Sequence, residues 1–321
     1  MTSVLVVGHD DTRELLPMAT CIELMADALA ALQRGEAANP LRSVLRPPEG
    51  AEGLLGVMPA WNGNFGLKAV GVFPENSQRG LDPHQGVVVL FSGETGEVEG
   101  LVNAAAITAI RTAAVSAVAT RLLARTDARV LGILGAGVQA RSHVEAMSEA
   151  MKPEQIVAWS PTPERLSALV SELPAVTAAP SAEEVVLAAD VLCTTTNARE
   201  PVVRRDWVKP GTHVNAVGSS IATTRELDTE TIAAASLYVD RRESTVNEAG
   251  DYLFPLQEGA IGPEHIKAEL GELLTGEADG RSSDDEITVF KSLGLAVEDL
   301  AAVSYVLRRA RELGRGTQVD L

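Results

Sequence analysis

The spacing of hydrophobic residues changes along the chain and divides it into regions with different predicted structure. Near the N-terminus, apolar residues recur at helical spacing, at Ile22, Met25, Ala26, Leu29 and Leu32. Thr20 and Glu23 fit a capping box at the start of this helix, and Gly35 fits its end. The sequence therefore predicts a helix that begins at Thr20.

The next region has the shorter repeat that is typical of β-strands. Strand-like runs occupy residues 53–60, 65–73, 86–91 and 98–102, and the segment 93–96 marks a hairpin between the last two. Because turns join these strands, we expect an antiparallel or mixed sheet. Residues 104–123 follow as a helical segment that is rich in small side chains.

Beyond residue 128, strand-like and helical segments alternate. The expected strands are 129–134, 155–160, 190–196, 213–219 and 236–240, and the helices between them include 163–172, 181–189 and 228–235. This alternation predicts a parallel sheet with helices on its faces. A last strand at 287–290 and a helix at 296–313 complete the pattern.

A glycine-rich loop after the first of these buried strands carries the strongest functional signal. The apolar run 130–134 leads into Gly135-Ala-Gly137-Val138-Gln139-Ala140 and then into a helical pattern. Gly135 allows a tight turn, and Gly137 has no Cβ to block a pyrophosphate from the backbone. The following helix offers free N–H groups and the positive end of its dipole. We therefore expect an NAD or NADP site here, although a glycine turn without a ligand would look similar.

The end of the second strand of such a domain decides between the two cofactors. An acidic residue there would bind the ribose 2′-OH of NAD. This chain instead has Ser160-Pro-Thr162, whose hydroxyls could serve either cofactor, so the sequence leaves NAD and NADP both open.

Composition narrows the range of partners and compartments. The net charge of −17 argues against nucleic acid and against anionic membranes, because both repel an acidic surface. We expect no membrane helix, because we find no apolar stretch of roughly 20 residues, and no signal peptide, because no basic segment precedes the first apolar run. The two cysteines and five histidines lack metal-ligand spacing, so we expect no metal. A cytoplasmic protein is the expectation.

Several motifs, taken in order, resemble the ornithine cyclodeaminase/μ-crystallin family over nearly the whole chain. They are Pro40-Leu-Arg42-Ser, Gly56-Val-Met-Pro59-Ala, Lys68, His84-Gln, Ile110-Arg111-Thr112-Ala, the glycine loop, Gly211-Thr-His-Val-Asn215-Ala-Val217-Gly218, Arg225-Glu-Leu-Asp228 and Val289-Phe-Lys-Ser292-Leu-Gly294. The resemblance is closer to the μ-crystallin branch, whose members are ketimine reductases.

The resemblance implies an α/β protein with two domains and a homodimer. A Rossmann-type doubly wound parallel sheet would span residues 115–289. An α+β domain for substrate binding and dimerisation would combine residues 1–114 with 290–321. This division agrees with the change in hydrophobic spacing described above.

The resemblance also assigns roles to individual residues. Arg42, Lys68 and Arg111 match positions that hold the carboxylate of a small amino or imino acid, a task that suits a guanidinium fork and an ammonium. His84 matches a position near the cofactor and is a further candidate for substrate binding, with a polar loop residue as the alternative. The implied cofactor-binding residues are Thr112, Gly135, Gly137, Val138, Gln139, Ser160, Thr162, Thr195, Val217, Gly218 and Ser292.

Asp228 and Lys68 are the candidates for acid/base chemistry. The resemblance favours a proton-transfer role for Asp228. Its position directly before a predicted helix also fits an N-cap, and this alternative stays open at the level of sequence.

Together these residues predict an NAD(P)H-dependent reductase of a small α-imino acid, in amino acid metabolism. Two alternatives remain: an ornithine cyclodeaminase that uses bound NAD without net redox change, and a μ-crystallin-like protein that only binds NADPH and a carboxylate ligand. Cyclodeaminases carry a glutamate three positions before the proline of the Met-Pro pair, where this chain has Gly56. That departure argues against ornithine, since its side-chain ammonium would lack a charged partner.

Overall fold

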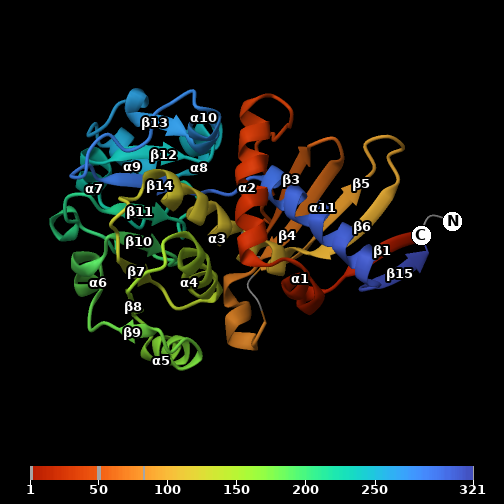
Figure 1. Cartoon of the computed structure of the whole chain (residues 1–321), viewed down its shortest axis with the longest axis horizontal. Coiled ribbons are helices and arrows are strands. Elements are labelled where there is room, and N and C mark those ends of the chain that lie inside the picture. The colour runs from red at the N-terminus through yellow and green to blue at the C-terminus, as the bar shows by residue number, and fades with distance from the viewer. Residues whose placement is uncertain (1–2, 49–51, 82–83, 321) are drawn as a thin grey trace. The chain divides into compact units, whose positions relative to one another are not determined.

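A computed structural model of the protein describes residues 3–48, 52–81 and 84–320. The chain forms two compact units: Met1–Arg111 together with Gly294–Leu321, called unit 1, and Thr112–Leu293, called unit 2. The boundary falls within α3 (Ala104–Leu123). Figure 1 labels the elements along the chain.

Unit 2 contains the parallel sheet that the alternating pattern predicts. Its eight strands lie in the order β13-β12-β14-β11-β10-β7-β8-β9. Their bounds are β7 Val130–Leu134, β8 Gln155–Trp159, β9 Val176–Ala178, β10 Val191–Thr194, β11 His213–Ala216, β12 Ser236–Val239, β13 Ile266–Glu269 and β14 Thr288–Lys291. The chain order runs outward in opposite directions from the neighbouring strands β7 and β10. The carboxyl ends of these two strands therefore form the switch point, where α/β sheets bind ligands.

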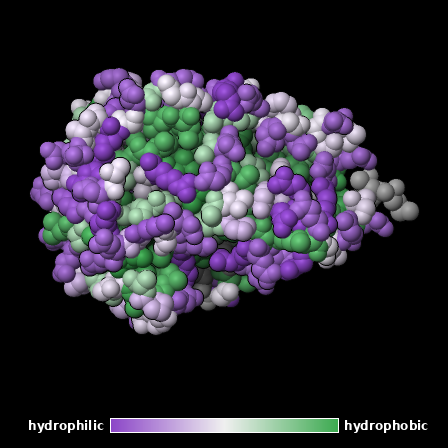
Figure 2. Space-filling model, viewed as in Figure 1, coloured by the Kyte–Doolittle hydropathy of each residue, from purple (hydrophilic) through white to green (hydrophobic). Residues whose placement is uncertain are grey.

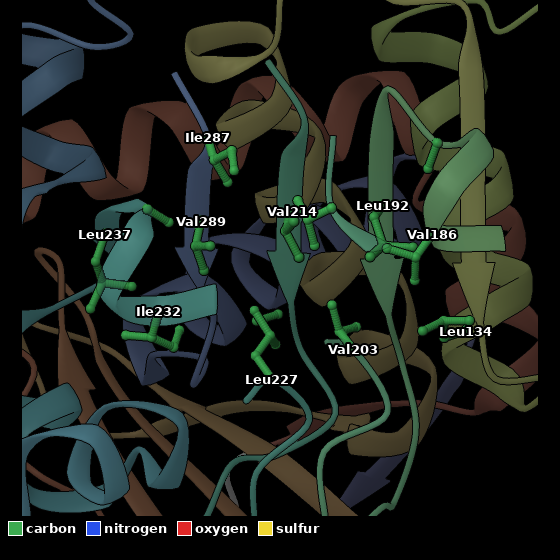
Figure 3. Packing of buried hydrophobic residues seen from close by; sticks show 14 of the residues in the cluster. Leu134, Val186, Leu192, Val203, Val214, Leu227, Ile232, Leu237, Ile287 and Val289 are labelled. Atoms are coloured by element: carbon green, nitrogen blue, oxygen red, sulfur yellow. The ribbon is translucent and has the colours of Figure 1, made fainter. Parts of the chain in front are cut away.

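Helices connect these strands. They are α4 Val138–Ala150, α5 Pro163–Glu172, α6 Ala182–Ala188, α7 Thr229–Ala234, α8 Arg242–Glu248, α9 Gly250–Gln257 and α10 Leu270–Thr275. The core between sheet and helices is mainly aliphatic and also contains Tyr252. Figure 3 shows Val186 of α6 beside Leu192 of β10, with Val203 and Leu227 lying below the strands.

Unit 1 is built on a mixed seven-stranded sheet in the order β15-β1-β6-β5-β4-β3-β2. The strands are β1 Ser3–Val7, β2 Ser43–Leu45, β3 Leu54–Trp61, β4 Phe65–Val72, β5 His84–Phe91, β6 Val98–Asn103 and β15 Thr317–Asp320. Neighbours from β2 to β6 pair antiparallel, while β1 pairs parallel with β6. The helices are α1 His9–Leu15, α2 Met18–Gln33 and α11 Ala296–Leu313.

The two faces of the unit 1 sheet have different neighbours. On the inner face α11 packs so closely that a Cβ at Gly66 would lie 2.4 Å from Leu300 Cδ1. The outer face is apolar but only partly covered: Trp61, Phe65 and Phe91 lie opposite one another on β3, β4 and β5, and Phe65 is 54% exposed. An apolar face of this kind is typical of an association surface.

Three sequence expectations need correction. The helix expected to begin at Thr20 begins at Met18, because Pro17 supplies the fixed φ that suits a helix start and no side chain caps it. The short strands β1, β2, β9, β13 and β15 were not predicted, since three to five residues carry too little periodic signal. Finally, α3 is 20 residues long and apolar enough to span a membrane, although 83% of that window is buried, as in the core helix of a soluble protein.

The net charge of −17 comes from 44 acidic against 27 basic residues. On the face drawn in Figure 2, hydrophilic residues cover most of the area and hydrophobic residues gather in separate patches.

Candidate active site

In unit 2, the sequence-predicted cofactor residues follow the carboxyl ends of neighbouring strands. The glycine loop follows β7, Ser160 follows β8, Thr195 follows β10, Val217 and Gly218 follow β11, and Ser292 follows β14. Five strands of one parallel sheet therefore end in these residues at the same edge. Dinucleotides bind at this edge in doubly wound sheets.

The two glycines of the loop are required for different reasons. Gly135 has φ +115°, and a Cβ there would lie 2.7 Å from Thr195 Oγ1. Thr195 in turn donates from its backbone N–H and its hydroxyl to the carbonyl of Leu134, at 2.8 and 3.0 Å. Gly135 therefore lets the loops after β7 and β10 pack together.

Gly137, in contrast, faces open space. A Cβ at this position would have no atom within 4 Å beyond its chain neighbours, and the residue has an ordinary φ of −89°. It is the N-cap of α4 and offers no side chain to its first turn, where Val138 and Gln139 lie. This arrangement of open space and uncapped N–H groups fits the pyrophosphate of a dinucleotide.

Arg141 on α4 supports this loop, and the motif did not identify it. Its Nη1 donates to the carbonyls of Ala136 and Gly137, at 2.9 and 3.1 Å. These two bonds hold the loop carbonyls, so the loop's geometry is defined on both sides of Gly137.

After β8, the two hydroxyl residues form part of a turn. Ser160 is buried, and its Oγ accepts a bond from the N–H of Thr162 at 3.3 Å. Thr162 is the N-cap residue of α5. This turn carries no carboxylate between β8 and α5, which is consistent with either cofactor.

A buried carboxylate, Glu226, joins the loops after β10 and β11. Its Oε1 accepts bonds from the N–H and hydroxyl of Thr196, and its Oε2 accepts bonds from the Thr194 hydroxyl and the Gly218 N–H. All four distances are 2.7 Å. Burial raises the pKa of the Glu226 carboxyl, while Lys291 and the two threonines oppose that rise.

Next to it lies a buried ion pair. Lys291 Nζ is 3.0 Å from Asp251 Oδ2 and also donates to the carbonyl of Ala216 at 3.1 Å. Asp251 accepts the backbone N–H groups of Glu226 and Leu227 through its other oxygen. The pair therefore ties β14 to β11 and fixes the segment that carries Glu226. Ser292 continues this connection, since its N–H bonds to Ala216.

In unit 1, two of the predicted cations meet through one carboxylate. Asp299 of α11 lies 3.1 Å from Lys68 Nζ and 3.0 Å from Arg111 Nε, and Glu298 lies 2.8 Å from Arg111 Nη1. All four side chains are buried, with at most 4% of any residue exposed. Two cations and two carboxylates balance one another, so the cluster has no net formal charge when Lys68 is protonated.

Burial changes the acidity of this cluster. It lowers the pKa of Lys68 from 10.5 to about 8, with Asp299 opposing the shift and Arg111 adding to it. A lysine with a pKa near 8 can donate a proton in the physiological range. Cys21 lies in the same region, and burial raises the pKa of its thiol, which keeps it protonated.

Three further predicted residues are Arg42 and His84 of unit 1 and Thr112 of unit 2. Arg42 is half-buried and directly precedes β2, whose Ser43 pairs with Val57 of β3. His84 is the first residue of β5, pairs with Val72 and is exposed. Thr112, the first residue of unit 2, is buried within α3.

Asp228 occupies the capping role that the sequence left open. Its Oδ1 accepts the N–H of Thr231 at 2.9 Å at the start of α7, and its Oδ2 accepts the N–H of Arg205 at 3.0 Å. Both oxygens are therefore engaged by backbone donors. These bonds establish the cap, and the expected role in proton transfer stays a prediction.

Sequence reasoning missed Glu226, Glu298 and Asp299, although each carried a signal. Glu298 and Asp299 are acidic residues within an otherwise apolar helix face, and carboxylates are rarely buried without a partner. Glu226 stands inside the Arg-Glu-Leu-Asp motif, two residues before Asp228.

Comparisons with known proteins identify the family. The model of the ornithine cyclodeaminase/mu-crystallin family matches residues 3–314. Ketimine reductase mu-crystallin of Mus musculus is 42% identical over 276 residues, covering 85% of both chains.

Two solved structures have the same fold along their whole length. Delta(1)-pyrroline-2-carboxylate reductase of Thermococcus litoralis, in complex with NADH and L-proline, is 37% identical with a TM-score of 0.95 and covers 98% of this chain and 100% of its own. An archaeal alanine dehydrogenase dimer with bound NAD is 32% identical with a TM-score of 0.94 and full coverage of both chains. The protein thus belongs to the ornithine cyclodeaminase/mu-crystallin family.

Proposed function

We propose that the protein is an NAD(P)H-dependent reductase of a small α-imino acid. The observation that carries the proposal is the buried cluster in which Asp299 holds both Lys68 and Arg111. The open glycine loop at the switch point of unit 2 supplies the place for the cofactor. The mu-crystallin and delta(1)-pyrroline-2-carboxylate reductase relatives support the same reaction type.

The cations of unit 1 bind the substrate carboxylate in this proposal. Arg111 offers a planar guanidinium that Asp299 and Glu298 hold in one orientation, which reduces the entropy lost on binding. Arg42 contributes a second guanidinium. Because the cluster is formally neutral, a bound carboxylate adds one negative charge, and in this proposal the Arg42 guanidinium balances it.

Lys68 supplies the proton. Protonation of the imine nitrogen makes the C=N carbon a better acceptor, and a buried lysine with a pKa of about 8 is suited to donate at neutral pH. The bound nicotinamide supplies the hydride for that carbon. Asp299 keeps the Lys68 ammonium oriented and raises its pKa, opposing the effect of burial.

The residues around Gly56 of β3 disfavour a substrate with a charged side chain. Gly56 pairs with Val70, and a Cβ there would lie 3.4 Å from Val70 Cγ1. This apolar position cannot pair with a side-chain ammonium, which favours a cyclic imine such as pyrroline- or piperideine-2-carboxylate, or a small acyclic imine. Net consumption of reduced cofactor separates this reaction from cyclodeamination and from simple ligand binding.

A homodimer is part of the proposal. The outer face of the unit 1 sheet presents rows of apolar side chains, including Pro59, Leu67 and Val89 opposite one another on β3, β4 and β5. The related alanine dehydrogenase is a dimer. Leu67→Glu should convert the dimer to a monomer in sedimentation velocity, while Arg204→Glu, a charge change on an exposed residue of unit 2, should leave it unchanged.

The proposal also covers the compartment of the protein and its preference between NADH and NADPH. We place the protein in the cytoplasm because of its composition. The turn at Ser160 and Thr162 has hydroxyls in place of a carboxylate, so both NADH and NADPH are expected to serve.

The direct test is oxidation of NADH and NADPH across a panel of substrates. The panel holds cyclic imino acids, and oxo acids with and without ammonia or methylamine. Turnover of at least one imino acid is expected; tight cofactor binding without any turnover would favour the binding-protein alternative.

A further inference from the structure

We propose that Glu226 is a positioning residue that holds the loops after β10 and β11 in the geometry required by the nicotinamide half of the cofactor. The inference rests on the proposed function, because it presupposes a bound dinucleotide. Glu226 itself touches no reacting atom in this account. It acts through Thr196 and Gly218, whose loops follow β10 and β11, two neighbouring strands on the same side of the switch point.

The first support is the number of donors that converge on one side chain. A carboxylate has about four acceptor positions, and four donors at 2.7 Å occupy them here. Two of these donors are backbone N–H groups, one in each loop. Glu226 therefore links two loops that are not adjacent in sequence, and it does so through their backbones.

The second support is that the backbone of Gly218 lies too close to Thr196 and Glu226 for any side chain at position 218. A Cβ at Gly218 would lie 2.0 Å from the Thr196 carbonyl and 2.5 Å from Glu226 Oε1. Gly218 thus has to be glycine because the Thr196 backbone and the Glu226 carboxylate fill the space. The contact with Glu226 therefore gives a structural reason for a glycine at this predicted cofactor position.

The third support is that the carboxylate itself is fixed. Asp251 accepts the N–H of Glu226, and the neighbouring Leu227 is fully buried in the core of unit 2, beside Val203 in Figure 3. Lys291 pairs with Asp251 and adds a bond to Ala216 of β11. Glu226 therefore acts as a rigid clamp.

The position of Glu226 relative to the sheet indicates which half of the cofactor its loops would contact. In a doubly wound sheet one mononucleotide lies on each side of the switch point. The glycine loop after β7 and the turn after β8 serve the adenosine and pyrophosphate side. The loops after β10 and β11 lie on the other side, which leaves them to the nicotinamide nucleoside.

The test compares a whole cofactor with a half. Glu226→Gln replaces one acceptor oxygen by an NH₂ group, which cannot accept from the facing N–H of Thr196 or Gly218. We expect the dissociation constant of NADH to rise about tenfold or more, and that of ADP to change less than about twofold. Titration calorimetry measures both constants on the purified full chain.

A matched control uses another glutamate of unit 2. Glu269 accepts a backbone N–H bond from Arg242 at 2.7 Å and caps α10, away from the loops after β10 and β11. Glu269→Gln should leave the ratio of NADH to ADP affinity unchanged. If Glu226→Gln fails to fold, Thr194→Val decides, since it removes one of the four bonds and should shift the same ratio in the same direction by a few-fold.

The possible outcomes distinguish failure of the positioning role of Glu226 from failure of the proposed reductase function. Failure of the wild-type chain to bind NADH would refute the proposed function. Wild-type binding with an unchanged NADH to ADP ratio in Glu226→Gln, or in Thr194→Val if that variant is needed, would refute the positioning role alone. Equal loss of both affinities would also refute it, because it would show a general structural effect on the unit.

Discussion

Replacing Asp299 by Asn should move the pH dependence of the reaction toward acid. Asp299 lies 3.1 Å from Lys68 Nζ and is the strongest influence that keeps the pKa of this lysine from falling further. Asn keeps the size of the side chain and removes its charge. The Lys68 ammonium would then lose its charged partner and release its proton at lower pH.

The size of the effect follows from the distance. Two unit charges 3.1 Å apart interact by about 5 kcal/mol at an effective dielectric constant of about 20, which is an upper bound. Nearby opposite charges in proteins usually change a pKa by about one to three. Because the protonated lysine is the active form, wild-type activity should fall as the pH rises through about 8. In Asp299→Asn this fall should begin about one to three pH units lower.

The assay is the pH profile of kcat/KM for the imino acid, which reports groups of the free enzyme. Wild type and variant share the same substrate, so ionisation of the substrate cancels in the comparison. Glu298→Gln is the matched control, since Glu298 binds Arg111 and has the smallest effect on the pKa of Lys68 among the named causes. An Asp299→Asn profile that falls at the wild-type pH would show that Lys68 is not the acid.

Three further substitutions test individual assignments. Gly137→Asp should abolish NAD(P)H binding in a folded protein, because a carboxylate would enter the open space before α4; unchanged binding in fluorescence titration would remove the cofactor from this loop. Arg111→Lys should raise KM for the imino acid roughly tenfold with little change in cofactor affinity, through loss of the bidentate fork; wild-type KM would assign Arg111 to the fold. Asp228→Asn should keep the cap bond to Thr231 but lose the acceptor for the Arg205 N–H, so its melting temperature should fall; a fall in turnover of about 10²-fold or more in the folded variant would support proton transfer by Asp228, and retained turnover would assign it to the cap alone.

Periodic patterns in the sequence were enough to predict the long elements and the fold class. The helices 104–123 and 296–313 have the predicted bounds, and the strands after residue 128 lie within a few residues of their expected positions. Such segments carry several turns or a full apolar run, so the signal accumulates. Short strands such as β13 lack that length and depend on their neighbours in the sheet.

The candidate site could be predicted only in part, because a motif names residues but not their partners. Lys68 and Arg111 were predicted separately, yet Asp299 joins them from 188 or more positions away in the chain. The local sequence around Asp228 permitted both a cap and an acid. The N–H groups of Thr231 and Arg205 show that Asp228 is a cap, and its proton-transfer role stays a prediction.

The most direct test of the central claim is the stoichiometry of one reaction. Purified protein is mixed with NADH or NADPH and delta(1)-pyrroline-2-carboxylate, and both cofactor oxidation and proline formation are measured. The account predicts that oxidised cofactor and proline form in equal amounts, and that Lys68→Met abolishes both while retaining cofactor binding. Release of ammonia from ornithine with no net oxidation of cofactor, together with no proline formed from the imine, would contradict it.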